Sequence, residues 1–273
     1  FMKDKKLNLL YIFLIIFFSS SHANKNFIII QSTTSTSDSG FYRYIIKKFN
    51  KSFSTEVRVV AVGTGQAIRN AKKCDADILF VHHKPSELEF VKSGYGLYRK
   101  EVMYNDYVLV GPRDESIGIR KIDNIEMALK KIYEFKLNFV TRGDQSGTHK
   151  KELELWERAG VSNLDIKNKW YIQTGSGMGA SLNIAVNKQA YILTDRSTWI
   201  SFGNKKNHKI LVQNEPLLIN RYGIIPINPR NCPKVKLEKS EEFINWLTSE
   251  EGQREINLFR KDGQQLFFSS FSN

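Results

Sequence analysis

The chain has 273 residues, of which 41% are hydrophobic and 12% are aromatic. This composition excludes a disordered or fibrous protein, and the length is sufficient for one or two folded domains. The formal net charge of +13 favours anionic partners, namely nucleic acid, acidic membranes or small anions. The lysines are scattered along the chain, however, which favours solvated surface charge as the explanation of the excess.

The first 23 residues have the pattern of a secretory signal peptide. Lys3, Lys5 and Lys6 precede an apolar run over residues 7–18, and small residues follow it up to Ala23. The run is shorter than the roughly 20 residues that span a membrane, which disfavours the alternative of an uncleaved anchor. We therefore predict a periplasmic protein, exported by a cleaved N-terminal signal peptide at residues 1–23. An exported protein rarely meets nucleic acid, so that class of partner is excluded.

Strand-like and helix-like segments alternate after the leader, which predicts an α/β fold with mainly parallel sheets. The expected strands lie at residues 27–30, 57–62, 77–82, 138–141, 169–173 and 190–194. The expected helices lie at residues 40–53, 66–72, 125–133, 147–158 and 177–188. Two longer extended stretches, 102–112 and 217–227, are suited to crossing between two lobes. This pattern predicts lobe I from residues 24–107 and 218–273, lobe II from residues 108–217, and a ligand cleft between them.

The C-terminal tail is expected to form one helix over residues 240–259. Ser240 is a suitable N-cap, and Phe243, Trp246 and Leu247 recur at helical spacing.

The chain contains two cysteines, Cys74 and Cys232. They can pair in an oxidising compartment or remain as two buried thiols, and their spacing does not decide between these outcomes. No spacing of Cys or His residues indicates a metal site.

Four strand-to-helix junctions share the chemistry of an anion site. They are residues 32–40, 63–66, 141–148 and 174–179, and each is rich in Ser, Thr or Gly. The N-terminus of a helix offers free backbone N–H groups and a positive dipole end, and hydroxyls add neutral donors. Any one such loop is explained by helix capping and turn formation. Four of them in one two-lobed chain, with Arg142 in the third, predict an oxyanion site.

The residue types alone leave the identity of the anion open. A carboxylate from Asp38, Asp144 or Asp195 that faces the ligand would favour phosphate, which keeps a proton near neutral pH. If these aspartates instead cap helices or orient arginines, the acceptor-only dianions tungstate, molybdate and sulfate fit equally well. Arg196 is a second candidate cation, and its alternative role is an ion pair with Asp195 or a surface position.

The strongest enzyme alternative is a nucleotide-binding oxidoreductase. Residues 175–180 fit the pattern G-x-G-x-x-A, and Asp195 follows at the spacing of a dinucleotide-binding fingerprint. The predicted export and the adjacent Arg196 disfavour it. His82, His83 and His149 are better explained as capping or surface residues than as general bases.

At these same segments the chain resembles the periplasmic tungstate-binding proteins of ABC transporters. The motifs TTSTSDSG at 33–40, VGTGQA at 62–67, DADIL at 75–79, YNDYVLVGP at 104–112 and RGDQSGTH at 142–149 occur in the order expected for that family. Residues 175–179, 191–199 and 246–253 complete the resemblance. The chain departs from the family pattern at two positions: Ser32 replaces the expected Ala or Thr, and Ser197 replaces the expected Gly. These departures concern the fine selectivity among oxyanions.

The resemblance implies a type II periplasmic-binding-protein fold and a function in binding, not catalysis. Tungstate, with molybdate as a second ligand, would be captured between the lobes and delivered to the membrane permease by a monomer. The resemblance implies no cofactor and no bound metal ion, since tungsten would enter as part of the oxyanion. The alternative is a binding protein for phosphate or sulfate. The resemblance implies that Arg142 is the main residue that balances the charge of the anion. The other implied ligands are Thr33, Thr34, Ser35, Thr64, Ser146, Thr148, Ser176, Gly177 and Arg196.

Overall fold

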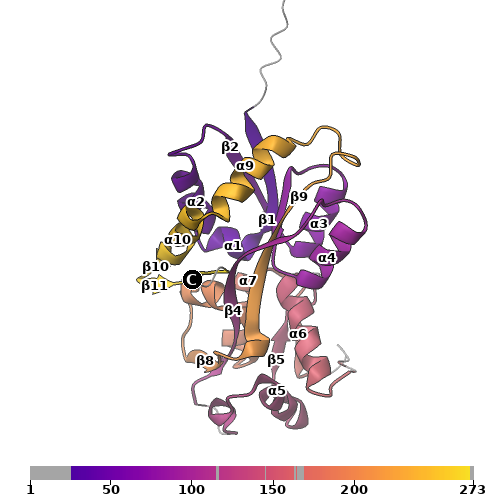
Figure 1. Cartoon of the computed structure of the whole chain (residues 1–273). Helices are drawn as coiled ribbons and strands as arrows, with labels where there is room; N and C mark the ends of the chain where they lie inside the picture. The colour runs from indigo at the N-terminus through magenta and orange to yellow at the C-terminus, as the bar shows by residue number, and fades with distance from the viewer. Residues whose placement is uncertain (1–25, 115–116, 145, 163, 165–168, 271–273) are drawn as a thin grey trace, which may run out of the picture.

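The computed structural model describes residues 26–114, 117–144, 146–162, 164 and 169–270. Within these residues the chain forms two α/β lobes connected by two long strands (Figure 1), which confirms the predicted fold class. The predicted signal peptide, residues 1–23, lies outside the described residues. No helix of the described part is both long and apolar enough to cross a membrane.

Lobe I is a sheet with helices on both faces. Its strands β1 (Phe27–Thr33), β2 (Glu56–Val62) and β3 (Ile78–Val81) run parallel, with β1 in the centre. Its helices are α1 (Thr34–Asp38), α2 (Phe41–Phe49), α3 (Thr64–Lys72), α4 (Lys84–Lys92), α9 (Leu237–Leu247) and α10 (Glu250–Leu258).

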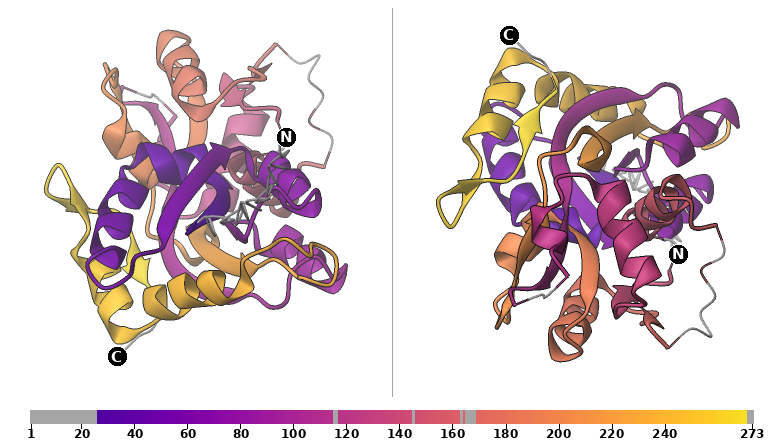
Figure 2. Two further views of the ribbon diagram at one scale, coloured as in Figure 1. Left: turned by 90° about the horizontal axis from the view of Figure 1, so that it is seen from above. Right: turned by 90° about the horizontal axis from the view of Figure 1, so that it is seen from below.

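The pleat of β3 explains how both faces of this sheet are covered. Successive side chains of a strand point to opposite faces. Ile78 and Phe80 pack with α2, α9 and α10, whereas Leu79 and Val81 pack with α3 and α4. Figures 1 and 2 show α2 beside α9 and α10, on the other side of the lobe from α3 and α4.

Lobe II repeats this arrangement. Strand β5 (Phe139–Thr141) runs parallel to β6 (Tyr171–Gln173) and β7 (Tyr191–Asp195). The remaining elements are η1 (Ile119–Lys121), α5 (Ile125–Glu134), α6 (Gly147–Arg158), α7 (Met178–Asn187), α8 (Arg196–Ser201) and β8 (His208–Val212).

The two predicted crossings are strands β4 (Lys100–Pro112) and β9 (Ile219–Pro226), which pair antiparallel. The single sheet path therefore runs β2-β1-β3-β9-β4-β7-β5-β6 through both lobes. A short turn, η2 (Pro216–Leu218), leads into β9. Near the C-terminus, β10 (Arg260–Lys261) and β11 (Gln264–Gln265) form a hairpin, and β12 (Phe268–Ser269) pairs with β4.

The prediction of one tail helix over residues 240–259 is wrong. The chain forms α9 and α10 with a break at Thr248 and Ser249, because the Ser249 hydroxyl accepts from the Gly252 N–H and so caps a new helix. Ser240 is not a cap but lies inside α9, where its hydroxyl bonds back to the Lys236 carbonyl at 3.0 Å. Helices α4 and α8 and strand β8 were not predicted.

Cys74 and Cys232 form a disulfide, which answers the question that their spacing left open. The bond ties the segment after α3 to the segment after β9, across a sequence separation of 158 residues. Within the described residues, no group of His, Cys, Asp and Glu is arranged to hold a metal ion.

His83 is the N-cap of helix α4, and this cap makes the stability of the protein depend on pH. The His83 Nδ1 accepts from the Ser86 N–H, and burial, followed by the nearby Lys150 ammonium, lowers the pKa of His83 to about 4. The unfolded chain has a His pKa of about 6.5. Between these values the unfolded state binds a proton that the folded state does not, so the free energy of unfolding falls as pH falls.

We therefore expect urea denaturation to show a lower free energy of unfolding at pH 5 than at pH 7.5. Asparagine is also a good helix cap, but it does not titrate. The free energy of unfolding of His83→Asn should therefore fall less between pH 7.5 and pH 5 than that of the wild-type protein. Burial also lowers the pKa of His82, so some dependence remains in the variant. Identical pH dependence in the two proteins would contradict a contribution from His83.

Candidate functional site

A small cavity lies where the two lobes meet, with an accessible volume of about 10 Å³, roughly the room for one water-sized particle. Three of the four predicted loops contribute to it, at the starts of α1, α3 and α6. Its walls are Thr33, Thr34, Ser35, Val62, Gly63, Thr64 and His82 from lobe I and Arg142, Ser146, Gly147 and Thr148 from lobe II. The cavity therefore joins segments that are far apart in the sequence.

Lobe I contributes neutral donors to this cavity. Thr33 ends β1 and Gly63 follows β2, so both loops lie at the carboxyl edge of the parallel sheet. The Thr33 hydroxyl bonds to those of Thr36 at 2.8 Å and Ser35 at 3.3 Å. Thr64 is the first residue of α3, where backbone N–H groups have no intrahelical acceptor.

Lobe II contributes the positive charge. Arg142 follows β5 and is buried, and its Nη2 donates to the Asp144 carboxylate at 2.6 Å. The same carboxylate accepts from the Ser146 N–H at 3.1 Å and from the Ser146 hydroxyl at 2.6 Å. Asp144 thus orients the arginine and the start of α6, and it does not line the cavity. Ser146 lines the cavity, but Asp144 accepts from both its N–H and its hydroxyl.

Two donors of the cavity wall are left without a partner. Thr64 Oγ1 and Arg142 Nε are buried and make no hydrogen bond within the described residues. A buried donor without an acceptor costs about 1–3 kcal/mol, and more where the group is charged. One donor belongs to each lobe, so a single acceptor-rich ligand in the cavity can satisfy both.

His82 is a cavity residue that the sequence did not identify. It follows β3 and is buried, so it is not a surface residue, and the adjacent helix α4 is capped by His83. Its Nδ1 lies 3.2 Å from the Tyr107 hydroxyl and 3.1 Å from Asn220 Oδ1, and Asn220 Nδ2 donates to Asn105 Oδ1 at 2.7 Å. Burial lowers the pKa of His82, which keeps its ring neutral near pH 7. The ring connects the cavity to the strands that join the lobes.

The structure does not bring the remaining predicted ligands to this cavity. Ser176 and Gly177 precede α7; Gly177 is exposed, and the Ser176 hydroxyl donates to the Thr174 carbonyl at 3.1 Å. Arg196 pairs with Asp106, not with Asp195, through hydrogen bonds of 2.6 and 2.5 Å. Its guanidinium lines a different cavity.

None of the three aspartates that left the anion undecided lies on the described wall of the cavity. Asp195 caps α8 and accepts from the N–H and hydroxyl of Thr198 and from the Ser197 hydroxyl. Its carboxylate is buried and already accepts these three hydrogen bonds at the start of α8, which disfavours a role in binding the ribose of a dinucleotide. Asp38 ends α1 and lies outside the cavity wall.

The family model described as the PBP superfamily domain matches residues 19–251 of the chain. The chain is 43% identical over 247 residues to the tungstate-binding protein TupA of Peptoclostridium acidaminophilum, which covers 89% of this chain and 85% of the relative.

Two solved structures are similar as well. The tungstate-binding protein TupA from Desulfovibrio alaskensis G20 is 38% identical, with a TM-score of 0.79 over 90% of this chain and 99% of that one. The tungstate ABC transporter structure from Geobacter sulfurreducens is 41% identical, with a TM-score of 0.77 over 85% of this chain and 98% of that one.

Proposed function

This chain belongs to the PBP superfamily, among its tungstate-binding proteins, and we propose that it captures tungstate between its lobes. It is the exported solute-binding component of an ABC transporter, and it delivers the anion to the membrane permease. It binds its ligand without chemistry and is not an enzyme. The observation that carries the proposal is the pair of buried, unpartnered donors, Thr64 Oγ1 and Arg142 Nε, on facing walls of the cavity.

The composition of the walls favours an acceptor-only dianion. Arg142 is the one cationic side chain on the described wall, and no carboxylate lines it. A protonated phosphate would need an acceptor, whereas tungstate needs only donors. The first-turn N–H groups of α3 and α6 add donors and positive dipole ends from both lobes.

Molybdate has the same charge and nearly the same size as tungstate, so we expect both to bind. Sulfate is smaller, so donors that are spaced for tungstate would contact it less well, and we expect it to bind more weakly. The ligand bridges the lobes, and the closed form then offers the permease one defined surface. In this proposal the protein is a monomer without a cofactor, divided at residues 107/108 and 217/218, and residues 1–23 are the cleaved leader.

Calorimetric titration of residues 24–273 with tungstate, molybdate, sulfate and phosphate tests this function. Tight tungstate binding, molybdate binding of similar strength and weak phosphate binding are the expected results. Tight phosphate binding with no response to tungstate would overturn the assignment of the anion. No response to any of the four would overturn the binding function itself.

Thr64→Val removes the unpartnered hydroxyl while keeping the shape of the side chain. We expect it to weaken tungstate binding about tenfold, because a hydrogen bond to a charged group contributes roughly 1.5 kcal/mol or more. Thr64→Ser keeps the hydroxyl and should retain most of the affinity. Equal dissociation constants for the valine and wild-type proteins would show that Thr64 does not contact the anion.

A further inference from the structure

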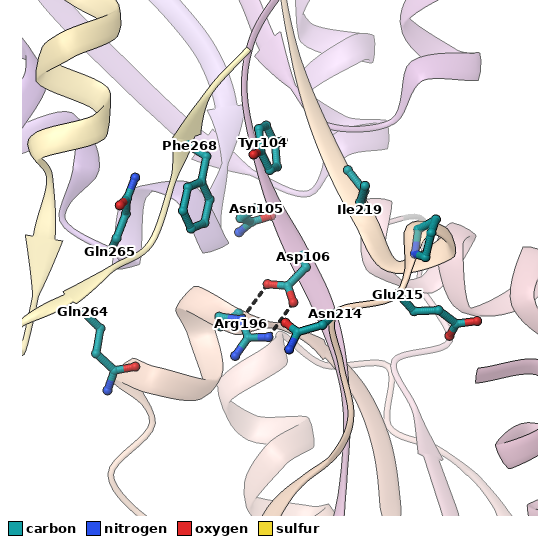
Figure 3. A pocket seen from close by; sticks show the side chains of 11 residues that line it. Tyr104, Asn105, Asp106, Arg196, Asn214, Glu215, Ile219, Gln264, Gln265 and Phe268 are labelled. Atoms are coloured by element: carbon teal, nitrogen blue, oxygen red, sulfur yellow. Dashed lines mark hydrogen bonds and ion pairs between the residues drawn. The ribbon is translucent and has the colours of Figure 1, made fainter. Parts of the chain in front are cut away.

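A second and much larger cavity, with a volume of about 590 Å³, lies beside strands β4 and β9 (Figure 3). It shares no wall residue with the first cavity. Its walls come from β4, the start of β9, the start of α8, the turn after β8 and the C-terminal hairpin with β12. A volume of this order is typical of sites for small organic molecules.

One buried donor in this cavity has no partner. Asn105 is 1% exposed, and its Oδ1 accepts from Asn220 Nδ2 at 2.7 Å. Its Nδ2 makes no hydrogen bond within the described residues, and Figure 3 shows the amide among the side chains that line the cavity. Because an unsatisfied buried amide is unfavourable by about 1–3 kcal/mol, this group indicates a ligand with a hydrogen-bond acceptor.

Two stacked aromatic rings form an apolar part of the cavity wall. Tyr104 and Phe268 face each other across the β4–β12 pair, with centroids 5.3 Å apart and planes inclined by 22°. Phe268 is 38% exposed, and the neighbouring wall residue Ile219 is 36% exposed. Flat apolar groups of this kind favour an aromatic ring as the body of the ligand.

The charges on the wall exclude a strongly anionic ligand. Arg196 is neutralised by its two hydrogen bonds to Asp106, and its Nη1 donates to Gln213 at 2.9 Å. The Glu215 carboxylate accepts from the Ile125 N–H at 2.7 Å. All three nitrogens of the Arg196 guanidinium therefore have acceptors within the protein, whereas the Nε of Arg142 has none within the described residues.

We propose that this cavity is a second ligand site, which binds a small uncharged aromatic carboxamide. The ring of the ligand packs against Phe268 and Ile219, and its carbonyl accepts from Asn105 Nδ2. The side-chain amide oxygen of Asn214, also on the wall, is an acceptor for its NH₂ group.

Benzamide is a suitable probe, with ¹H–¹⁵N NMR of the isotope-labelled protein as the readout. We expect saturable shifts of the Asn105 side-chain amide and of the Ile219 backbone amide, with a dissociation constant in the millimolar range usual for so small a ligand. Benzoate, which carries a charge in place of the NH₂ group, should bind at least tenfold more weakly. Equal binding of the two would overturn the uncharged class, and no saturable shift would overturn the site.

The same NMR titration of three variants tests whether benzamide binds in this cavity. Phe268→Ala, on an exposed edge strand, should weaken benzamide binding at least fivefold, and Asn105→Asp should do the same while keeping the acceptor for Asn220. Phe135→Ala removes a ring that is 57% exposed at the end of α5, outside the cavity wall, and should leave binding unchanged. Unchanged binding in Phe268→Ala would overturn the proposed location even if Asn105→Asp fails to fold.

Discussion

Replacing Arg142 with alanine is expected to weaken tungstate binding by roughly a hundredfold to several thousandfold. The cavity would then hold a buried dianion without a cation, and removing one partner of a buried charge pair costs about 3–5 kcal/mol. Arg142 is buried, and its Nε has no other partner within the described residues. Isothermal titration calorimetry at constant ionic strength measures the change in the dissociation constant.

Two further variants separate the loss of the arginine from its side effects. Arg142→Ala also leaves the Asp144 carboxylate without its 2.6 Å partner, so freed negative charge could repel the anion. The double variant with Asp144→Ala should recover only a small part of the affinity. Arg196→Ala is the matched control, because Arg196 pairs with Asp106 outside this cavity and its removal should change the dissociation constant less than threefold. Equal losses in Arg142→Ala and Arg196→Ala would contradict the assignment of the charge partner.

The three cavity loops could be predicted from sequence because their signal is local. Residues 33–35, 63–64 and 142–148 each follow a strand of a parallel sheet and open a helix, and the fold brings the carboxyl ends of such strands together. Hydroxyls, glycines and free N–H groups at these points are properties of the segment itself.

The structure differs from the sequence-based prediction where the position of a side chain depends on a distant partner. Arg196 was expected in the oxyanion site, but its position is determined by Asp106, which lies 90 residues earlier in the chain. Residues 176–177 have the same local chemistry as the three loops that line the cavity, yet they open a helix whose start is not on the cavity wall. His82 was overlooked because only the tertiary fold shows that it is buried against α6.

The tail shows a local signal that outweighs helical spacing. Phe243, Trp246 and Leu247 do form one apolar face, as their spacing predicts, and they pack in the core of lobe I. The sequence Thr248-Ser249-Glu250-Glu251 nevertheless starts a second helix, because a serine cap followed by acidic residues stabilises a new N-terminus. That capping pattern predicts the break between the two helices.

The contact between the lobes depends on the missing side chain of Gly147. It is the first residue of α6, and it faces lobe I at the cavity wall. A Cβ atom added here would lie 2.9 Å from His82 Cε1 and 3.1 Å from Thr64 Oγ1. The His82 ring has little freedom to retreat, since its Nδ1 is held by Tyr107 and Asn220.

Gly147→Ala is therefore expected to weaken tungstate binding by up to about a hundredfold, as overpacking of a tight contact costs roughly 1–3 kcal/mol. Lobes that separate in the absence of ligand relieve this contact, so the melting temperature of the ligand-free protein should change little. Gly179→Ala, in the first turn of α7 with open space around it, is the matched control and should bind normally. If the two variants bind tungstate equally well, the lobes do not need this close approach. If only Gly147→Ala is weakened, and its tungstate-bound form has a larger radius of gyration by X-ray scattering, then the contact among Gly147, His82 and Thr64 limits how far the protein closes on its ligand.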